Sequence, residues 1–282
     1  MGTRIYAQII YTEEHPGFST EGYAVMNRAM EQVYRTVLHP DTEVEVRFVP
    51  RSTFYTSHLY LEMLNNVGLV EGIIRGEEEG YDVAFIRCGN DPAVREARET
   101  VAMPVVGITE AAMHLACQLG SKFAVIGVDA KSQPIVERNI RLFGLENRAI
   151  AYRPVRMPTR ADWMETLMQG PRWFSDMDFV RDTVAPAFDE VARRCIDDGA
   201  EVIVTGCAMY AAFTLAGHNQ VSGTVVPIVE SVAVGMKQAE MLGDLRRTLG
   251  ISTSKHLTYQ TYLTPEMRSG LTAPFTAQPV VA

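Results

Sequence analysis

Short apolar runs alternate with segments of helical periodicity along most of the chain. The spacing of apolar residues at three or four positions predicts helices at about 22–38, 60–78, 92–101, 109–119, 132–143, 178–198 and 209–217. Apolar runs between them predict strands at 4–11, 43–50, 82–88, 104–108, 122–129, 148–155, 201–207 and 225–230. This alternation predicts an α/β fold, with parallel sheets covered by helices on both faces.

The series of elements begins a second time after about residue 108. Gly80-Tyr-Asp-Val-Ala-Phe-Ile-Arg-Cys88 aligns with Gly199-Ala-Glu-Val-Ile-Val-Thr-Gly-Cys207, and each glycine lies eight residues before its cysteine. After one more helix, Pro104-Val-Val-Gly107 aligns with Pro227-Ile-Val-Glu230. Glycine, cysteine and proline in the same order indicate an internal repeat. We therefore favour two duplicated lobes over a single continuous sheet.

The repeat divides the chain into two lobes and two additions. We expect the first α/β lobe at 1–108 plus about 228–250, and the second at 109–227. An insert at 156–178 contains both tryptophans and is either a lid or subunit contact, or a surface excursion that packs its own aromatic side chains. The extension at 251–282 shows no clear period and would wrap a neighbouring subunit or be partly mobile.

Composition narrows the class of partner. The 282 residues include 47% hydrophobic residues and carry a net charge of −8, with no cluster of lysine and arginine. An acidic chain without a basic patch is not expected to bind nucleic acid or an anionic membrane surface. The chain shows no run of about 18 apolar residues and no cleavable leader, so we expect a cytoplasmic protein that acts on a small molecule.

Two of the four cysteines are candidates for chemistry. Cys88 and Cys207 end matching strands, and ligands of open parallel sheets bind beyond the carboxyl ends of strands. Cys117 and Cys195 fall within helical patterns, where cysteine usually serves as a small hydrophobic residue. The chain has no Cys-x-x-Cys or His-x-x-x-His motif, so we expect neither a metal site nor a cofactor.

The turns after these cysteines predict reactive thiols. Asp91 is a suitable N-cap, Pro92 suits the first helical position, and Gly89 allows a backbone N–H to approach a ligand closely. Small residues likewise lead from Cys207 into a helix. Because a helix start near sulfur lowers the pKa of a thiol, we expect thiolate at neutral pH.

Two facing thiols predict inversion at an acidic carbon. One thiolate would remove a proton from a carbon next to a carbonyl group, and the other thiol would return a proton on the opposite side. The N–H groups at Gly89, Asn90 and Ala208 would stabilise the enolate oxygen. Covalent catalysis by one cysteine, and a two-lobed binding module without catalysis, remain as alternatives.

The same residues resemble the aspartate/glutamate/hydantoin racemase superfamily, and most closely its hydantoin racemase branch. The matching segments are Cys88-Gly-Asn-Asp-Pro-Ala-Val-Arg-Glu-Ala-Arg98, Pro104-Val-Val-Gly-Ile-Thr-Glu-Ala-Ala112 and Gly206-Cys-Ala-Met209. The resemblance implies two flavodoxin-like lobes related by pseudo-twofold symmetry, an active site between them, two-cysteine catalysis without a cofactor, and a homo-oligomer. It implies Cys88 and Cys207 as the acid and base. It also implies a substrate-binding set of Gly89, Asn90, Asp91, Ala208, Met209, Thr12, Thr109 and Glu110.

The chain departs from the family pattern in two places. Hydantoin racemases usually carry an Asn-Pro-Asn-Thr/Ser element where this chain has Tyr11-Thr-Glu-Glu-His-Pro-Gly17, so the substrate-recognition loop is altered. Glutamate racemases follow the second cysteine with Thr-His, whereas Ala208 and Met209 stand here. The superfamily also contains maleate cis-trans isomerases, in which a cysteine adds to the substrate, and arylmalonate decarboxylases with one cysteine. We therefore expect a racemase or epimerase of a small carbonyl compound, hydantoin-like or a related cyclic amide, with cis-trans isomerisation, hydrolysis or a lyase reaction as alternatives.

Overall fold

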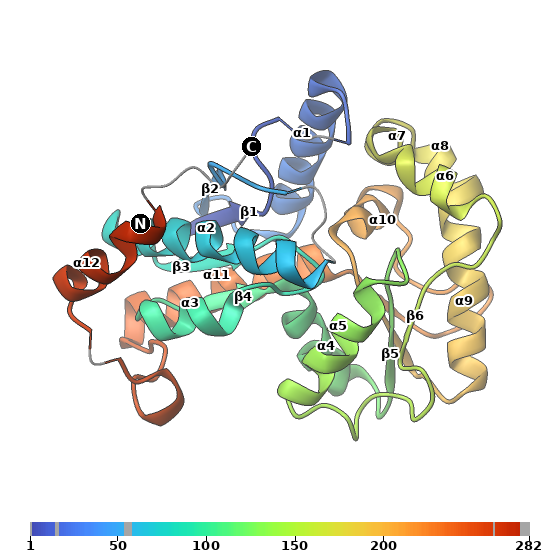
Figure 1. Ribbon diagram of the computed structural model, residues 1–282. Helices are drawn as coiled ribbons and strands as arrows, with labels where there is room; N and C mark the ends of the chain where they lie inside the picture. Colours follow the sequence, from blue (N-terminus) through green and yellow to red (C-terminus); the bar gives the residue numbers. More distant parts are fainter. Residues whose placement is uncertain (1, 15–16, 54–57, 262, 277–282) are drawn as a thin grey trace.

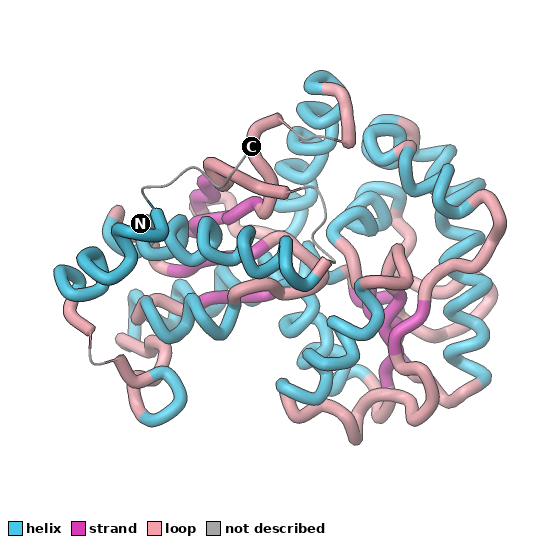
Figure 2. The backbone as a smooth tube through the Cα atoms, in the orientation of Figure 1, coloured by secondary structure: helices cyan, strands magenta, loops and turns pink. Residues whose placement is uncertain are grey.

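The computed structural model describes residues 2–14, 17–53, 58–261 and 263–276, and these residues form two parallel sheets of four strands each (Figures 1 and 2). The first sheet has the order β2-β1-β3-β4 and the second has β6-β5-β7-β8, which is the same order in a second copy. The expected α/β fold with two parallel-sheet lobes is confirmed. The strands are β1 (Arg4–Ile9), β2 (Glu43–Phe48), β3 (Val83–Ile86), β4 (Val105–Gly107), β5 (Phe123–Ile126), β6 (Val155–Arg156), β7 (Val202–Thr205) and β8 (Ile228–Val229).

Helices cover both faces of the first sheet. On one face lie α1 (Thr20–Val37) and α11 (Ser231–Leu249), and on the other α2 (Leu59–Glu78) and α3 (Val94–Thr100). Strand β1 explains this division, because its alternate side chains enter two different apolar clusters, Ile5 with α1 and Tyr6 with the α2 side. The first lobe therefore has three layers.

The second sheet is covered in the same way. One face packs against α4 (Ile108–Leu119) and α5 (Ser132–Leu142), and the other against α9 (Ala185–Asp197). The apolar cluster on the α9 side continues without a break into the cluster around α1 and α11. One continuous core therefore joins the two lobes.

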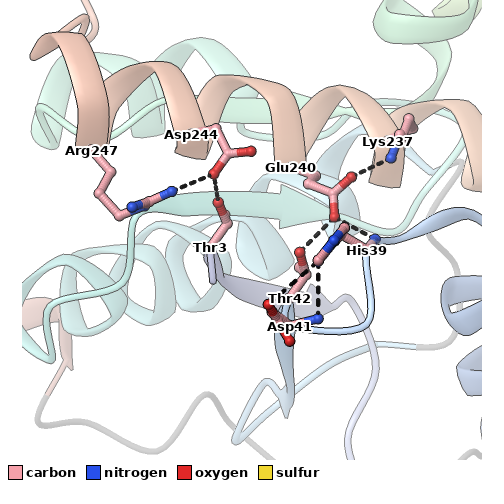
Figure 3. A network of polar contacts seen from close by, with 8 residues as sticks. All are labelled: Thr3, His39, Asp41, Thr42, Lys237, Glu240, Asp244 and Arg247. Atoms are coloured by element: carbon pink, nitrogen blue, oxygen red, sulfur yellow. Dashed lines mark hydrogen bonds and ion pairs between the residues drawn. The ribbon is translucent and has the colours of Figure 1, made fainter. Parts of the chain in front are cut away.

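Helix α11 returns the chain to the first lobe. Its buried Glu240 accepts hydrogen bonds from the His39 backbone N–H at 2.7 Å and the Thr42 hydroxyl at 2.5 Å, and Asp244 accepts one from the Thr3 hydroxyl (Figure 3). Strand β8 still pairs with β7, so the chain crosses between the sheets at about Glu230, where we expected 228. We propose this crossing and the one near residue 108 as the lobe boundaries.

Several elements differ from the sequence expectation, and proline explains two of them. The strand expected at 148–155 is reduced to β6 and an isolated bridge at Ala149, because Arg153 has a φ of 45° and Pro154 has no N–H to donate. The helix expected at 178–198 is interrupted by a π-helical turn, Val180–Val184, which ends two residues before Pro186, and Pro186 cannot donate to the preceding turn.

Further helices appear where none was predicted. Besides α11, these are α6 (Trp163–Met168) and α7 (Gly170–Ser175) in the insert and α12 (Pro265–Thr276) in the extension. The remaining short elements are α8 (Met177–Phe179), η2 (Ala208–Ala211), α10 (Ala212–Ala216) and η3 (Leu257–Tyr259). No helix among the described residues is both long and apolar enough to span a membrane.

Candidate active site

A cavity of about 460 Å³ lies where strands of both sheets end. Its lining includes the residues that follow β1 and β3 in the first lobe and those that follow β5 and β7 in the second. These are the carboxyl ends of equivalent strands, since both sheets have the same order. The cavity therefore occupies the position at which open α/β sheets bind ligands, and both lobes contribute to it.

Both strand-end cysteines line this cavity, and their loops are built alike. Cys88 is buried and Cys207 is half-buried, and both are free thiols. The Cys88 sulfur accepts a hydrogen bond from the backbone N–H of Asn90, and the Cys207 sulfur accepts one from the backbone N–H of Met209. Each thiol thus receives the N–H two residues further along, so the sequence repeat is also a repeat of local geometry.

The two cysteine loops touch each other through their backbones. A Cβ placed on Gly89 would lie 2.0 Å from the carbonyl oxygen of Gly206 and 3.0 Å from the Cα of Cys207. Only glycine permits this approach, because any side chain at position 89 would push the loops apart. Gly89 therefore sets the spacing between the two loops.

The thiols are less acidic than the sequence suggested. Burial raises the pKa of the Cys88 thiol far above its usual range, and it raises the pKa of Cys207 to about 12. The N–H donors of Asn90 and Met209 act in the opposite direction but do not outweigh the loss of hydration. The expectation of a lowered thiol pKa was wrong, because burial dominates even at Cys207, where a helical segment begins at the next residue.

Asp91 has a different role from the one expected. It does not cap α3, which begins three residues later at Val94 behind Ala93. Its carboxylate instead accepts the backbone N–H groups of Thr109 at 3.0 Å and Glu110 at 2.7 Å, and so caps α4. Asp91 and Ala93 both have positive φ, 46° and 57°, which shows that the loop is held in a strained conformation.

Thr109 and Glu110 form a supporting layer behind the first cysteine loop. The buried Thr109 hydroxyl donates to the Gly89 carbonyl at 2.7 Å, and Glu110 accepts two hydrogen bonds from Arg98 at 2.9 and 2.6 Å. Burial and the nearby Glu110 carboxylate raise the pKa of Asp91 to about 8. These groups hold the loop from behind, and none of Asp91, Thr109 and Glu110 is part of the cavity lining.

The other expected binding residues divide into two groups. Gly89, Asn90, Ala208 and Met209 line the cavity as expected, and the Asn90 carbonyl is held by the Asn139 amide at 2.8 Å. Thr12 is not part of the lining, and its hydroxyl donates to the backbone of Glu14. Residues after β1 reach the cavity through Ile9, Ile10 and Tyr11 instead.

Much of the cavity wall was not predicted from the sequence. Its apolar part comes from α1 and the insert, and its polar part from scattered loop residues. The apolar residues include Phe18, Tyr23, Met26, Met30, Met164, Leu167 and Met168, and the polar ones include His58, Arg87, Asp129, Lys131 and Ser132. On a helical pattern such methionines are indistinguishable from core residues, but the charged Arg87 inside an apolar strand run was a usable signal.

The insert closes one side of the cavity and joins the lobes. Helix α7 packs on α1 so closely that a Cβ on Gly22 would lie 2.7 Å from the Pro171 ring. The indole rings of Trp163 and Trp173 are buried and meet edge to face, with centroids 5.8 Å apart. The insert thus packs its own aromatic side chains and also covers the ligand site.

A racemase family matches this fold and site. The model of the family described as Asp/Glu/Hydantoin racemase matches residues 17–239. Hydantoin racemase of Pseudomonas sp. (strain NS671) is 29% identical over 238 residues, 83% of this chain and 86% of that protein. Hydantoin racemase of Rhizobium meliloti is 32% identical over 199 residues, 70% of this chain and 73% of the relative.

Solved structures show the same architecture. Allantoin racemase from Klebsiella pneumoniae superposes with a TM-score of 0.69 at 23% identity, covering 95% of this chain and 98% of that one. The family match and the curated relatives identify the chain as an isomerase of the racemase type. The chain belongs to the Asp/Glu/hydantoin racemase family.

Proposed function

We propose that this enzyme racemises a small cyclic amide of the hydantoin type, with Cys88 and Cys207 as the two acid/base groups. The observation that carries the proposal is the matched pair of thiols, each two residues after its strand, β3 or β7, which line a single cavity. The names of the relatives, hydantoin racemase and allantoin racemase, support a ring of this class.

The proposed reaction is a proton exchange at carbon 5 of the ring. The thiolate of one cysteine takes the proton, and the electron pair of the broken C–H bond forms the enolate with the adjacent carbonyl group. We assign stabilisation of the enolate oxygen to backbone N–H groups of Gly89 and Ala208, which line the cavity. The thiol of the other cysteine then protonates carbon 5 from the opposite face. No cofactor enters this scheme.

The thiol environment suits a base for a weak carbon acid. Because burial raises both thiol pKa values, each thiolate is a strong base when it forms. The same burial makes the thiolate scarce in the empty site at neutral pH. A hydrogen bond from a backbone N–H to each sulfur stabilises the thiolate and lessens this cost.

Exchange in D₂O tests the two-base scheme. Wild-type enzyme should racemise 5-butylhydantoin and incorporate deuterium at carbon 5, as followed by polarimetry and mass spectrometry. Cys88→Ser and Cys207→Ser should each lower the racemisation rate at least about 100-fold, because each variant lacks one competent proton carrier. Cys117→Ser, which changes a cysteine outside the cavity, is the matched control. Full activity in either active-site variant would exclude two-base catalysis, and a covalent adduct on one cysteine would indicate nucleophilic catalysis instead.

The apolar wall of the cavity favours, as substrate, a hydantoin with an apolar substituent over allantoin. A five-membered ring fills only part of about 460 Å³, and the remaining wall consists largely of methionine and aromatic side chains. Such a wall favours a substituent with an apolar stem over the polar ureido group of allantoin.

We also propose that the enzyme works in the cytoplasm as a homo-oligomer. All four cysteines are free thiols, which suits a reducing compartment. The exposed apolar side chains Leu59, Tyr60, Met63 and Val67 of α2 support contact with a second copy of the chain.

A further inference from the structure

Arg87 places a buried guanidinium group in the wall of the cavity. It follows β3 directly, lines the cavity and is only 8% exposed. Its place in the sequence directly before Cys88 does not by itself give it a role in proton transfer. Burial of so strong a cation therefore requires an explanation.

The partners of Arg87 within the chain are neutral. Its Nη1 donates to the Tyr34 hydroxyl at 3.2 Å, and its Nη2 donates to the Asn27 side-chain oxygen at 2.8 Å. Among the described residues, no carboxylate lies within the 4.0 Å ion-pair distance of Arg87. The positions outside the described ranges contain no aspartate or glutamate. A buried charge without a counter-ion is unfavourable, so Arg87 is suited to pair with an anionic group of a ligand.

The Arg87 guanidinium and the Cys88 thiol lie on opposite sides of the first sheet. Successive side chains of an extended segment point to opposite sides. Cys88 packs in the cluster on the α2 side of the first sheet, whereas Arg87 reaches Asn27 and Tyr34 of α1 on the other side. Cys207 packs against the cluster on the α1 side. A ring whose carbon 5 lies against Cys88 can therefore extend its substituent toward Arg87.

The residues that line the cavity with Arg87 indicate which substituent on carbon 5 would fit. Met26 and Met30 of α1 line the same cavity and provide an apolar passage. Asp129 is an acidic residue of the cavity lining, and its carboxylate accepts the N–H groups of Lys131 at 2.8 Å and Ser132 at 2.9 Å. The cavity thus combines an apolar wall with an uncompensated cation.

We propose that Arg87 binds a carboxylate at the end of the substituent on carbon 5, so that the preferred substrate is a hydantoin with an apolar stem and an anionic tip. This inference rests on the proposed hydantoin racemase function. It makes Arg87 a specificity-determining residue, because a guanidinium pairs with a carboxylate through two parallel hydrogen bonds.

Matched substrates test this proposal without any substitution. We compare 5-(3-carboxypropyl)hydantoin with its neutral isostere 5-(3-carbamoylpropyl)hydantoin, using kcat/KM for racemisation. The wild-type enzyme should prefer the acid by at least about tenfold, because only the acid supplies the missing counter-ion. Equal rates, or a preference for the amide, would overturn the assignment of an anionic substituent.

Substitution of Arg87 tests whether this residue produces the preference. In Arg87→Met the ratio of acid to amide should fall to about one or below, while Arg87→Lys should keep part of it. Arg95→Met changes an exposed arginine on α3 in the same way and should leave the ratio as in wild type. An unchanged ratio in Arg87→Met would also overturn the proposal.

A neutral substrate separates this inference from the proposed function. Racemisation of 5-butylhydantoin by the wild type without a preference for the acid would reject only the role of Arg87. Failure of the wild type to racemise any of the three hydantoins would reject the proposed function itself.

Discussion

The two catalytic candidates illustrate how far a thiol depends on its hydration. Cys88 and Cys207 each accept one backbone N–H, yet both have a raised pKa because they are taken out of water. A cysteine beside a long helix start would be expected to have a lowered pKa. Here burial outweighs the backbone donors at both sulfurs, even at Cys207, where a short helical segment follows directly, so desolvation decides the direction of the pKa shift.

The rate of alkylation by iodoacetamide at different pH values should show that both thiol pKa values are raised. Below its pKa a thiol gains about tenfold in thiolate for each pH unit, so alkylation of Cys88 and Cys207 in the free enzyme should rise without a plateau from about pH 6 to 10. Mass spectrometry of each cysteine-containing peptide gives the separate rates. A titration midpoint between about pH 6 and 8 at either residue would contradict the raised pKa.

At the scale of elements, helix α4 holds the loop that carries Cys88 in its conformation. Asp91 reaches across to cap α4, and Thr109 in the first turn of α4 binds back to Gly89. The loop and the helix therefore hold each other in place. This reciprocal arrangement offsets the positive φ angles of Asp91 and Ala93.

Removal of the cap should lower both stability and activity. Asp91→Ala leaves two N–H groups of α4 without their acceptor, and we expect the free energy of unfolding to fall by about 2 kcal/mol. Asp91→Asn keeps one acceptor oxygen and should lose less. Urea denaturation measures the effect, and Asp178→Ala, at a side chain that is 86% exposed, is the control. An unfolding free energy within about 0.5 kcal/mol of wild type for Asp91→Ala would contradict the capping role.

At the scale of the whole molecule, the two lobes are joined by the insert on one side of the cavity and by α11 on the other face. Figure 1 shows α7 near α1 and α11 beneath the first sheet, although α11 follows the last strand of the second. Exposed apolar side chains remain on α2, namely Leu59, Tyr60, Met63 and Val67. They follow the helical period and lie at the end of α2 that begins beside the cavity residue His58.

The proposed homo-oligomer should depend on this face of α2. Met63→Glu places a charge among exposed apolar side chains and should raise the dissociation constant between subunits by at least about tenfold. Light scattering after size-exclusion chromatography measures the change. Met241→Glu, at an equally exposed methionine on α11, should have no effect. A monomeric wild type, or oligomers that persist in Met63→Glu and dissociate in Met241→Glu, would refute the assignment.

The sequence by itself was sufficient for the repeat and for most elements of the sheets. Apolar runs and helical periods are local patterns, and they located all eight strands, though β6 and β8 proved shorter than expected. Helix α11 was missed because Gly235 and Gly243 interrupt its apolar period. These glycines let the helix pack closely, since a Cβ on Gly243 would lie 2.4 Å from Thr3.

Sequence alone thus determined the class of fold and the pair of cysteines, because strand ends and their repeat are properties of neighbouring residues. Only the tertiary structure decided which residues surround those cysteines and how acidic they are. Asp91 caps α4 instead of lining the cavity, Thr12 lies outside the cavity lining, and Arg87 is part of it. Each outcome depends on contacts between segments distant in the chain and on exclusion of water, neither of which local sequence encodes.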